Sequence, residues 1–467
     1  MQLKHADPSD LQALRQALSL ADPQNKLKPI EMDSISIGPN ALDLLPEIVA
    51  ALSNRKKTLL VMDSTPILRN GVNCKERLLE LFTGQEVACL VLTDNPLHAD
   101  EKNAETIIAA LKGVYCVVAV GSGTICDLCK DASSRVTPLV PMVMVQTALS
   151  VNAFSDGVAV VLRNGVKRTL PARYPNVLLV DMQIVQEAPH DMNLAGFGDL
   201  AATWTAPADW SLANRLGMTD AYHDAPGDLL REQTAMLFEQ GAALAARDTA
   251  AMDRLAKVLT LSGLAMGVAG ESSPCSGTEH IISHMLDMSA KDRPLAYHGQ
   301  QVSISAILTA IAWDILFDEL EAENISVCFP QEETMRQMVY EAFKPLGSET
   351  AAECWADYQK KLALWHEKEA TVRDFFAHWA QHKSELKTLF ARPQVVSGGL
   401  QAAGAPTRFS NMNVPVLDGD AVRWALLNCH LMRKRFTLVD LLFYIGWWNE
   451  SFVERILERA EALNSGL

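Results

Sequence analysis

The sequence predicts an α/β domain, doubly wound and Rossmann-like with a mainly parallel sheet, followed by an all-helical domain. From about residue 30 to 186, near-continuous Val/Leu runs alternate with helical patterns, which is typical of a parallel sheet covered by helices on both faces. After LLVDMQIVQEAP the pattern changes and helical periodicity dominates. We therefore place the boundary near residue 186, with an α/β domain at 1–186 and a helical domain at 187–467.

The expected elements of the first domain follow one another in short blocks. The strand-like runs are TLLVMD, VACLVLT, YCVVAVGSG, PMVMVQTA, VAVVLRNG and NVLLVD. Helical patterns between them include KERLLELF, AETIIAALKG and a helix that begins at Thr124. In the second domain we expect amphipathic helices at 227–268, 302–322 and 334–391. The last of these is charged and rich in helix formers, so we expect surface helices there rather than chemistry.

Composition and charge narrow the class of protein. With 49% hydrophobic and 21% charged residues, the chain has the composition of an ordinary globular protein. The formal net charge of -15 argues against nucleic acid as a partner, because a polyanion would be repelled. We find no run of about 20 apolar residues that would favour membrane insertion, and the start, MQLKHADPSD, lacks the apolar core of a signal peptide. We therefore expect a cytoplasmic protein.

Nine cysteines are spread along the chain, an odd number that suits reduced thiols better than a disulfide framework. The one close pair is Cys126 and Cys129 in CDLC. Its spacing is that of a redox or zinc pair, but no second pair lies nearby in the sequence and the same spacing suits one face of a helix. We favour packing for both side chains.

A Gly-rich turn follows one predicted strand directly and opens a helix. In AVGSGTICDLCK, residues 121–124 fall where free N–H groups and the positive end of a helix favour a phosphate. The turn is not a full G-x-G-x-x-G, because Cys126 stands three positions after Gly123, and such turns also occur without a ligand. Asp63, at the end of TLLVMD, suits either a hydrogen bond to an adenosine ribose or a cap on the next turn. Together the two features indicate a dinucleotide.

Three histidines lie in the stretch GTEHIISHMLDMSAKDRPLAYHG. His280 and His284 are four residues apart and share one helical face, and His298 precedes Gly299 at the start of a helical run. Two imidazoles and one carboxylate would form a metal site with open coordination positions. The candidate carboxylate is Asp199 in AGFGDLAATW, an apolar context in which an unpaired charge is costly. From the spacing alone, the favoured alternative is an N-cap Asp with histidines that only satisfy neighbouring helices.

The order of these parts resembles the iron-containing alcohol dehydrogenase, glycerol dehydrogenase and dehydroquinate synthase superfamily. Within it, the chain is most similar to the sn-glycerol-1-phosphate dehydrogenase family, including its bacterial branch. The cues span about residues 30 to 447 and are GSGTICDLCK, QTALSVNAFSDGVAV, GFGDLAATWTAPADWSLAN, SGTEHIISHMLD, HGQQVSI, AAGAPTRFSNMNVP and LMRKRFTLVDLLFYIGW. Their combination is more specific than any one of them.

The resemblance implies a dehydroquinate synthase-like fold and assigns roles to particular residues. The metal ligands would be Asp199, His280 and His298, with His284 close to the bound substrate. The cofactor's pyrophosphate would be bound by Gly121, Ser122, Gly123, Thr124 and Asp127. The cofactor would be lined by Thr147, Leu149 and Ser150, and its ribose bound by Asp63. The first domain would thus bind the dinucleotide and the second the metal and substrate.

Several positions depart from the family pattern. Asn152 stands where these dehydrogenases usually have Asp, near the nicotinamide and the substrate, and we take it with His284 as a candidate catalytic residue. Gln146 replaces the usual Pro, and Ser122 replaces a second Gly. Ser273 stands where the glycerol-phosphate branch is expected to have Arg. These departures concern the substrate rather than the metal, and the helical segment around 350–391 exceeds the usual family size.

The activity that the resemblance implies is a metal-dependent, NAD(P)-linked interconversion of sn-glycerol 1-phosphate and dihydroxyacetone phosphate, a step of phospholipid metabolism. The divalent metal would be zinc, nickel or iron, since Asp with two His suits each of them. His284 would relay a proton. Alternatives in the superfamily are a dehydrogenase of glycerol or another alcohol, and a dehydroquinate synthase-like lyase or cyclase, although dehydroquinate synthases have Glu at the first ligand position. A non-catalytic binding protein is the alternative outside it.

The expected partner is a small polyol phosphate or alcohol, and the expected assembly is a homodimer or a larger homo-oligomer, as in similar proteins. A substrate phosphate needs donors. The candidates are Lys167, Arg168, Lys291, Arg293, Ser272, Ser273 and Ser276.

Overall fold

The computed structural model of the chain describes residues 3–163, 166–290, 296–321, 325–416 and 418–467. Contacts divide the chain into two compact units. Unit 1 comprises Met1–Phe197 and Asp228–Glu271, and unit 2 comprises Gly198–Gly227 and Ser272–Leu467. This division differs from the expected boundary at residue 186, because residues 228–271 pack with unit 1. Periodicity identifies a helix but does not say which core the helix buries its apolar face against.

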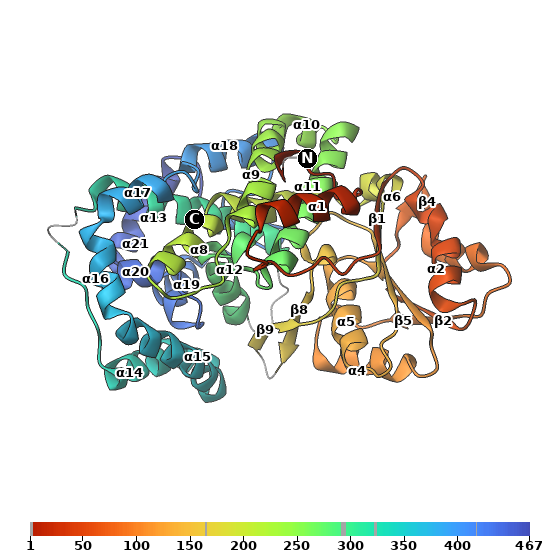
Figure 1. Cartoon of the computed structure of the whole chain (residues 1–467), viewed down its shortest axis with the longest axis horizontal. Coiled ribbons are helices and arrows are strands. Elements are labelled where there is room, and N and C mark those ends of the chain that lie inside the picture. Colours follow the sequence, from red (N-terminus) through yellow and green to blue (C-terminus); the bar gives the residue numbers. More distant parts are fainter. Residues whose placement is uncertain (1–2, 164–165, 291–295, 322–324, 417) are drawn as a thin grey trace. The chain divides into compact units, whose positions relative to one another are not determined.

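Unit 1 is built on a six-stranded sheet in which every neighbouring pair of strands is parallel (Figure 1). The strand order is β1-β10-β7-β6-β2-β5. The strands are β1 (Ser34–Gly38), β2 (Thr58–Asp63), β5 (Val87–Leu92), β6 (Cys116–Gly121), β7 (Met142–Gln146) and β10 (Val177–Asp181). The predicted parallel α/β sheet is confirmed. Strands β6, β7 and β10 are buried along their whole length, which is why their sequences are unbroken apolar runs.

The strand order reverses direction between β2 and β6, as in other doubly wound sheets. From β2 the chain runs to the edge strand β5, returns through α4 (Glu101–Ala110) to β6, and continues through α5 (Gly123–Ser134) to β7. Open α/β sheets bind their ligands at such a switch point, outside the carboxyl ends of the strands. Asp63 ends β2 and Gly121 ends β6, directly after the paired residues Met62 and Val120.

One expected strand lies outside this sheet. VAVVLRNG forms β8 (Val158–Arg163), which pairs with β9 (Val166–Pro171) in a separate antiparallel sheet. In β8, Ala159 and Val161 are buried, whereas Val158 and Val160 are partly buried and Leu162 is exposed. This alternation is typical of an antiparallel strand that covers a core with one face, and the Asn-Gly dipeptide at 164–165 is a hairpin signal in the sequence. The predicted strand is confirmed, but it lies outside the parallel sheet.

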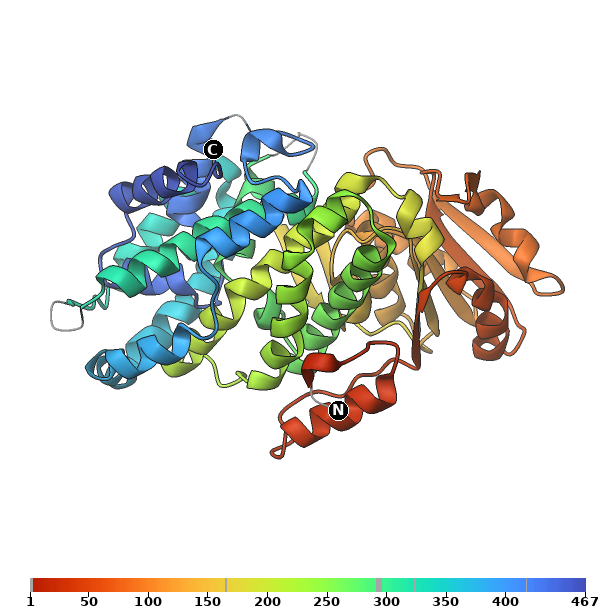
Figure 2. The ribbon, with the colours of Figure 1, turned by 90° about the horizontal axis from the view of Figure 1, so that it is seen from above.

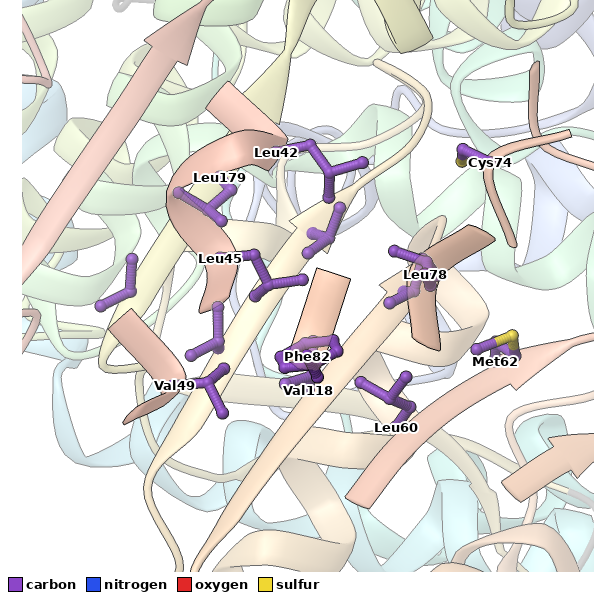
Figure 3. Packing of buried hydrophobic residues seen from close by; sticks show 14 of the residues in the cluster. Leu42, Leu45, Val49, Leu60, Met62, Cys74, Leu78, Phe82, Val118 and Leu179 are labelled. Atoms are coloured by element: carbon purple, nitrogen blue, oxygen red, sulfur yellow. The ribbon is translucent and has the colours of Figure 1, made fainter. Parts of the chain in front are cut away.

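A hydrophobic cluster fills one face of the parallel sheet (Figure 3). Leu60, Val118 and Leu179 come from three different strands and pack with Leu45 and Val49 of α2 (Leu45–Ser53). Each fully buried side chain of this kind contributes about 1.5–3 kcal/mol to stability. The strands are therefore held firmly, and the loops at their carboxyl ends begin from fixed positions.

The other helices of unit 1 include three where one was expected at 227–268. They are α9 (Asp224–Glu239), α10 (Gly241–Ala245) and α11 (Thr249–Ala269). The break before α11 has a local cause, because Arg247 has a positive φ of 55° and the Asp248 side chain accepts hydrogen bonds from two N–H groups of α11. The remaining helices are α1 (Leu11–Ala21), α3 (Cys74–Arg77), α6 (Met182–Glu187) and α7 (His190–Asp199), whose last two residues belong to unit 2. Cys126 and Cys129 are both buried in α5, as packing predicts.

Among the residues that the structure describes, unit 2 carries helices and no strand beyond an isolated bridge between Arg408 and Gly466. Its C-terminal helices are the teal and blue ribbons of Figure 2. The helices are α8 (Ala206–Arg215), α12 (Thr278–Ser289), α13 (His298–Glu319), α14 (Glu332–Phe343), α15 (Ser348–Glu367), α16 (Glu369–Ala377), α17 (Trp379–Leu386), α18 (Pro393–Ala403), α19 (Gly419–Asn428), α20 (Leu438–Tyr444) and α21 (Glu450–Glu461). Helix α13 is long and apolar enough to cross a membrane, but 94% of that window is buried inside the protein, as in a core helix.

The charged segment 334–391 is not only a set of surface helices. Helix α15 buries Tyr358, Lys361 and Trp365. Lys361 Nζ lies 2.6 Å from Asp440 Oδ1, in an ion pair whose side chains are each 1% exposed, and the Trp365 ring stacks on Tyr444 with centroids 4.4 Å apart. The expected helices are confirmed, but this buried ion pair was not expected, because a lysine in the sequence does not reveal that a carboxylate 79 residues later pairs with it in the core.

Candidate functional site

Three predicted metal ligands come together in unit 2. Asp199 ends α7, His280 lies in the first turn of α12, and His298 is the first residue of α13. One ligand atom from each lies within 4.8 Å of the others. Asp199 Oδ1 is 3.4 Å from His280 Nε2 and 3.9 Å from His298 Nε2. Two imidazole nitrogens and a carboxylate oxygen around one point are a donor set that zinc, nickel and iron accept.

Gly198 allows this approach. Gly198 precedes Asp199 and Gly299 follows His298, and a Cβ at Gly198 would overlap the Gly299 carbonyl oxygen. The end of α7 and the start of α13 therefore touch through their backbones, which brings the carboxylate next to the imidazole. Gly277 acts similarly before α12, because a Cβ there would lie 2.5 Å from a carboxylate oxygen of Asp209.

The far nitrogen of each histidine ligand has a partner. His280 Nδ1 lies 3.1 Å from Glu279 Oε1, and His298 Nδ1 lies 3.2 Å from Ser283 Oγ. Ser283 donates its own proton to Gln301 Oε1 at 2.7 Å, so its oxygen accepts from His298. Both rings thus donate through Nδ1, and Nε2 is the nitrogen that faces Asp199 and can bind a cation.

The electrostatics of the cluster favour positive charge at its centre. Burial alone lowers the pKa of His280, but its hydrogen bonds to Asp199 and Glu279 outweigh burial and raise it. Burial raises the pKa of Glu279, yet the hydrogen bonds from His280 and from backbone N–H groups reverse this and lower it. The two carboxylates, one at each ring nitrogen of His280, therefore favour positive charge on and beside this ring.

His284 borders this centre one helical turn further along α12. Its ring centroid lies 6.4 Å from that of His280 and 5.7 Å from that of His298. Arg433 Nη2 lies 3.2 Å from His284 Nδ1. A guanidinium only donates, so Nδ1 accepts and Nε2 carries the proton of the neutral ring. His284 is thus placed to donate a hydrogen bond beside the metal position.

Residues that the sequence did not single out complete the site. They are Glu279, Ser283 and the basic run 433–435. Arg435 Nη1 donates to the Ser276 carbonyl oxygen at 2.6 Å, and Nη2 donates to Ser272 Oγ at 2.9 Å. Glu279 was visible beside His280, but nothing in a linear sequence indicates that Arg433, 149 residues after His284, lies against it.

The candidate phosphate donors are spread over the chain. Ser272 and Ser276 flank the short helix η6 (Ser273–Cys275), in which Ser273 is buried. Lys167 and Arg168 lie on β9 of unit 1. Lys291 and Arg293 lie outside the described residues. The two flanking serines are therefore the candidates that the structure places with an arginine of unit 2.

The Gly-rich turn lies in unit 1 at the carboxyl end of β6. Gly121 ends the strand, Ser122 is the N-cap residue of α5, and Gly123 and Thr124 begin the helix. A Cβ at Gly121 would lie 2.7 Å from the Ile125 side chain, so the tight turn needs glycine. The first N–H groups of α5 have no partner within the helix and favour an anion, which fits a pyrophosphate.

The segment after β7 runs beside this turn. The Thr147 N–H donates to the Gly121 carbonyl oxygen at 3.1 Å. The Leu149 N–H donates to Asn193 Oδ1 of α7 at 2.8 Å, and Ser150 and Asn152 are buried in the same loop. The structure thus brings Thr147 to the predicted phosphate turn and anchors the loop that follows.

Asp63 and Asp127 both make contacts within unit 1. Asp63 Oδ1 lies 2.5 Å from Lys75 Nζ, and Oδ2 accepts from Thr65 Oγ1 at 2.8 Å, which is the turn-capping arrangement. Asp127 lies in α5, and its pKa is raised to about 7, mainly by burial. A partly protonated carboxyl group repels a pyrophosphate less than an ionised one does. Binding of ribose by Asp63 and of pyrophosphate by Asp127 stays a prediction.

Comparison with known proteins shows which family the chain belongs to. A family model described as iron-containing alcohol dehydrogenase matches residues 36–189. A protein of Bacillus subtilis named glycerol-1-phosphate dehydrogenase, NAD(P)+, is 31% identical over 289 residues, which cover 61% of this chain and 72% of that protein. The chain belongs to the glycerol-1-phosphate dehydrogenase family. A protein of the same name from Pyrococcus horikoshii is 31% identical over 301 residues, which cover 62% of this chain and 81% of that protein.

Solved structures show the fold of this glycerol-1-phosphate dehydrogenase family member. A probable glycerol dehydrogenase from Sinorhizobium meliloti matches with a TM-score of 0.56 and 14% identity, over 94% of this chain and 99% of that one. An iron-containing alcohol dehydrogenase from Corynebacterium glutamicum matches with a TM-score of 0.55 and 13% identity, over 92% of this chain and 95% of that one. The expected superfamily fold is confirmed.

Proposed function

We propose that the protein is a metal-dependent, NAD(P)-linked dehydrogenase that interconverts sn-glycerol 1-phosphate and dihydroxyacetone phosphate. The observation that carries the proposal is the convergence of His280 Nε2 and His298 Nε2 on Asp199 Oδ1, in a chain of the glycerol-1-phosphate dehydrogenase family. Relatives of that name provide the reaction, an oxidoreduction at a CH–OH group with NAD or NADP.

Asp199, His280 and His298 hold the divalent metal. When bound, the metal supplies a Lewis acid that stabilises negative charge on the substrate oxygen. His284 would donate a hydrogen bond from Nε2 to that oxygen, where it stabilises the charge that develops during hydride transfer. Arg433 keeps His284 in the tautomer that this role needs, because it occupies Nδ1 at 3.2 Å.

Unit 1 would hold the nicotinamide cofactor, which would supply or accept the hydride. Gly121, Ser122, Gly123, Thr124 and Asp127 would bind the pyrophosphate. Thr147, Leu149 and Ser150 would line the cofactor, Asp63 would bind the ribose, and Asn152 would contribute on the nicotinamide side. Support comes from the free N–H groups of α5 and from the switch point of the sheet, where β2 and β6 end side by side.

The substrate phosphate binds at the basic run 433–435 beside η6. The guanidinium of Arg435 is fixed against Ser272 and Ser276, and that of Arg433 lies beside His284. Guanidinium and hydroxyl groups are common phosphate donors. Ser273 stands at the position where Arg was expected and carries no charge. Arg435 supplies a positive charge beside the same short helix.

Arg435→Met is expected to lower kcat/KM for dihydroxyacetone phosphate about 10-fold or more, since a hydrogen bond to a charged group is worth about 1.5–3 kcal/mol. The value for unphosphorylated dihydroxyacetone should change much less. Steady-state kinetics with both ketones measure the ratio. Arg423→Met is the control, because Arg423 pairs with Glu454 on α21. An equal loss with both ketones would show that Arg435 only supports the fold.

The substrate is tested by a panel of dihydroxyacetone phosphate, dihydroxyacetone and simple ketones with NADH and NADPH in metal-replete protein. The proposal expects consumption of reduced cofactor with dihydroxyacetone phosphate. Turnover of the unphosphorylated ketones alone would indicate a glycerol or other alcohol dehydrogenase. A lyase or cyclase of the dehydroquinate synthase type would give no net change in absorbance. The cytoplasmic location, the homo-oligomer and the role in phospholipid metabolism stay predictions.

A further inference from the structure

We propose that Glu279 is a positioning residue that sets the metal affinity of the site, through a charged hydrogen bond to His280. The inference rests on the proposed function in one respect, that Asp199, His280 and His298 bind a divalent cation. It does not depend on which substrate is turned over.

Glu279 is held at three points. It is fully buried, and its Oε1 accepts from the Gly277 N–H at 2.5 Å and from His280 Nδ1 at 3.1 Å. Its Oε2 accepts from Thr205 Oγ1 at 2.8 Å. A carboxylate with so many fixed partners has little freedom to rotate, so the ring of His280 is held in one orientation.

The contact with Thr205 connects two ligand-bearing segments. Thr205 directly follows the short helix η5 (Leu200–Trp204), and η5 directly follows Asp199. Glu279 directly precedes His280 at the start of α12. The hydrogen bond from Thr205 to Glu279 therefore fixes the chain just after one ligand against the chain just before another. The Glu279 side chain thus both fixes these two segments relative to each other and supplies a negative charge next to a metal ligand.

The second histidine meets a hydroxyl group at the same nitrogen. His298 Nδ1 lies 3.2 Å from Ser283 Oγ, and Ser283 donates to Gln301 Oε1. The side chain of His298 is 22% exposed, whereas that of His280 is 9% exposed. A carboxylate partner raises the basicity of an imidazole ligand, whereas a hydroxyl group chiefly orients it. The contact with Glu279 should therefore strengthen His280 as a ligand more than the contact with Ser283 strengthens His298.

The test compares Glu279→Gln with Ser283→Ala in the full-length, metal-free protein. Gln keeps the size of Glu and can still accept from His280 and Gly277, so the change removes the charge and keeps the shape. The dissociation constants for Zn²⁺ and Ni²⁺ are measured by competition with a chromophoric chelator, without substrate or cofactor. We expect Glu279→Gln to raise the constant about 10- to 100-fold, and Ser283→Ala to raise it less. Circular dichroism of the metal-free variants checks their fold.

A dissociation constant for Glu279→Gln within threefold of wild type, or a larger loss in Ser283→Ala, would overturn the proposal. If the Gln variant does not fold, Thr205→Val is used instead, because it removes the hydrogen bond to the other oxygen of the Glu279 carboxylate. It should raise the constant about 2- to 10-fold, and an unchanged constant overturns the proposal. Because the readout is metal affinity, its failure is distinct from failure of the proposed function, which appears as the absence of turnover in metal-loaded wild-type protein.

Discussion

Asp199→Ala is expected to remove high-affinity metal binding and to lower kcat/KM for dihydroxyacetone phosphate about a thousandfold or more. Asp199 is 1% exposed and supplies the only carboxylate of the described triad. Without it the two imidazoles are left with no anionic ligand, and the Lewis acid that stabilises the substrate oxygen is lost. Metal analysis of the purified variant and steady-state kinetics measure the two effects.

The matched control is Asp418→Ala in the same unit. Asp418 is the N-cap of α19, where its side chain accepts from Asp420 N and Ala421 N. Its loss should cost about 1 kcal/mol of stability and leave the metal content unchanged. An Asp199→Ala protein that retains stoichiometric metal and more than a tenth of wild-type activity would rule out the assigned ligand.

Gly198→Ala is expected to weaken metal binding and to destabilise unit 2, although the change adds a single methyl group. The added Cβ would overlap the Gly299 carbonyl oxygen and lie 3.0 Å from Ser303 Cβ, so the end of α7 must move away from α13. Overpacking of this kind costs about 1–3 kcal/mol. Because Asp199 and His298 are the adjacent residues, the same movement separates two ligands. Urea unfolding and chelator competition measure the stability and the metal affinity.

Gly398→Ala provides the control for the substitution itself. Gly398 lies in α18 of the same unit, and a Cβ there would have nothing within 4 Å. This change should stabilise the protein by about 0.5–1 kcal/mol, because Ala is the better helix former, and should leave the metal affinity alone. Similar effects of the two substitutions would contradict the claim that contact between Gly198 and Gly299 builds the site.

Local patterns in the sequence predicted the parts that depend on local physics. TLLVMD and YCVVAV are buried strands because a parallel sheet covered on both faces needs unbroken apolar runs. His280 and His284 share a helix face because their spacing matches one helical turn. Local patterns did not identify Asp199 as a ligand, since its carboxylate could equally have capped a helix. The family resemblance decided that choice, and the geometry of the triad agrees with it.

Features that depend on long-range packing were missed. β8 looks like the strands of the parallel sheet over a few residues, but it pairs with β9 in a hairpin. Residues 228–271 carry the periodicity of the second domain and yet pack in unit 1. Arg433 and Arg435 reach α12 and η6 from the C-terminal part of the chain. In each case the missing information is a contact between distant residues, which periodicity and spacing do not contain.

The central claim is that the triad of unit 2 holds the metal with which the protein reduces dihydroxyacetone phosphate. The most direct measurement follows the absorbance of NADH and NADPH with this ketone before metal removal, after chelation, and after addition of Zn²⁺, Ni²⁺ or Fe²⁺. The account predicts turnover in the metal-loaded protein, loss on chelation, and recovery with at least one metal at one equivalent per chain. Protein that holds one equivalent of metal and oxidises neither cofactor with dihydroxyacetone phosphate would contradict it.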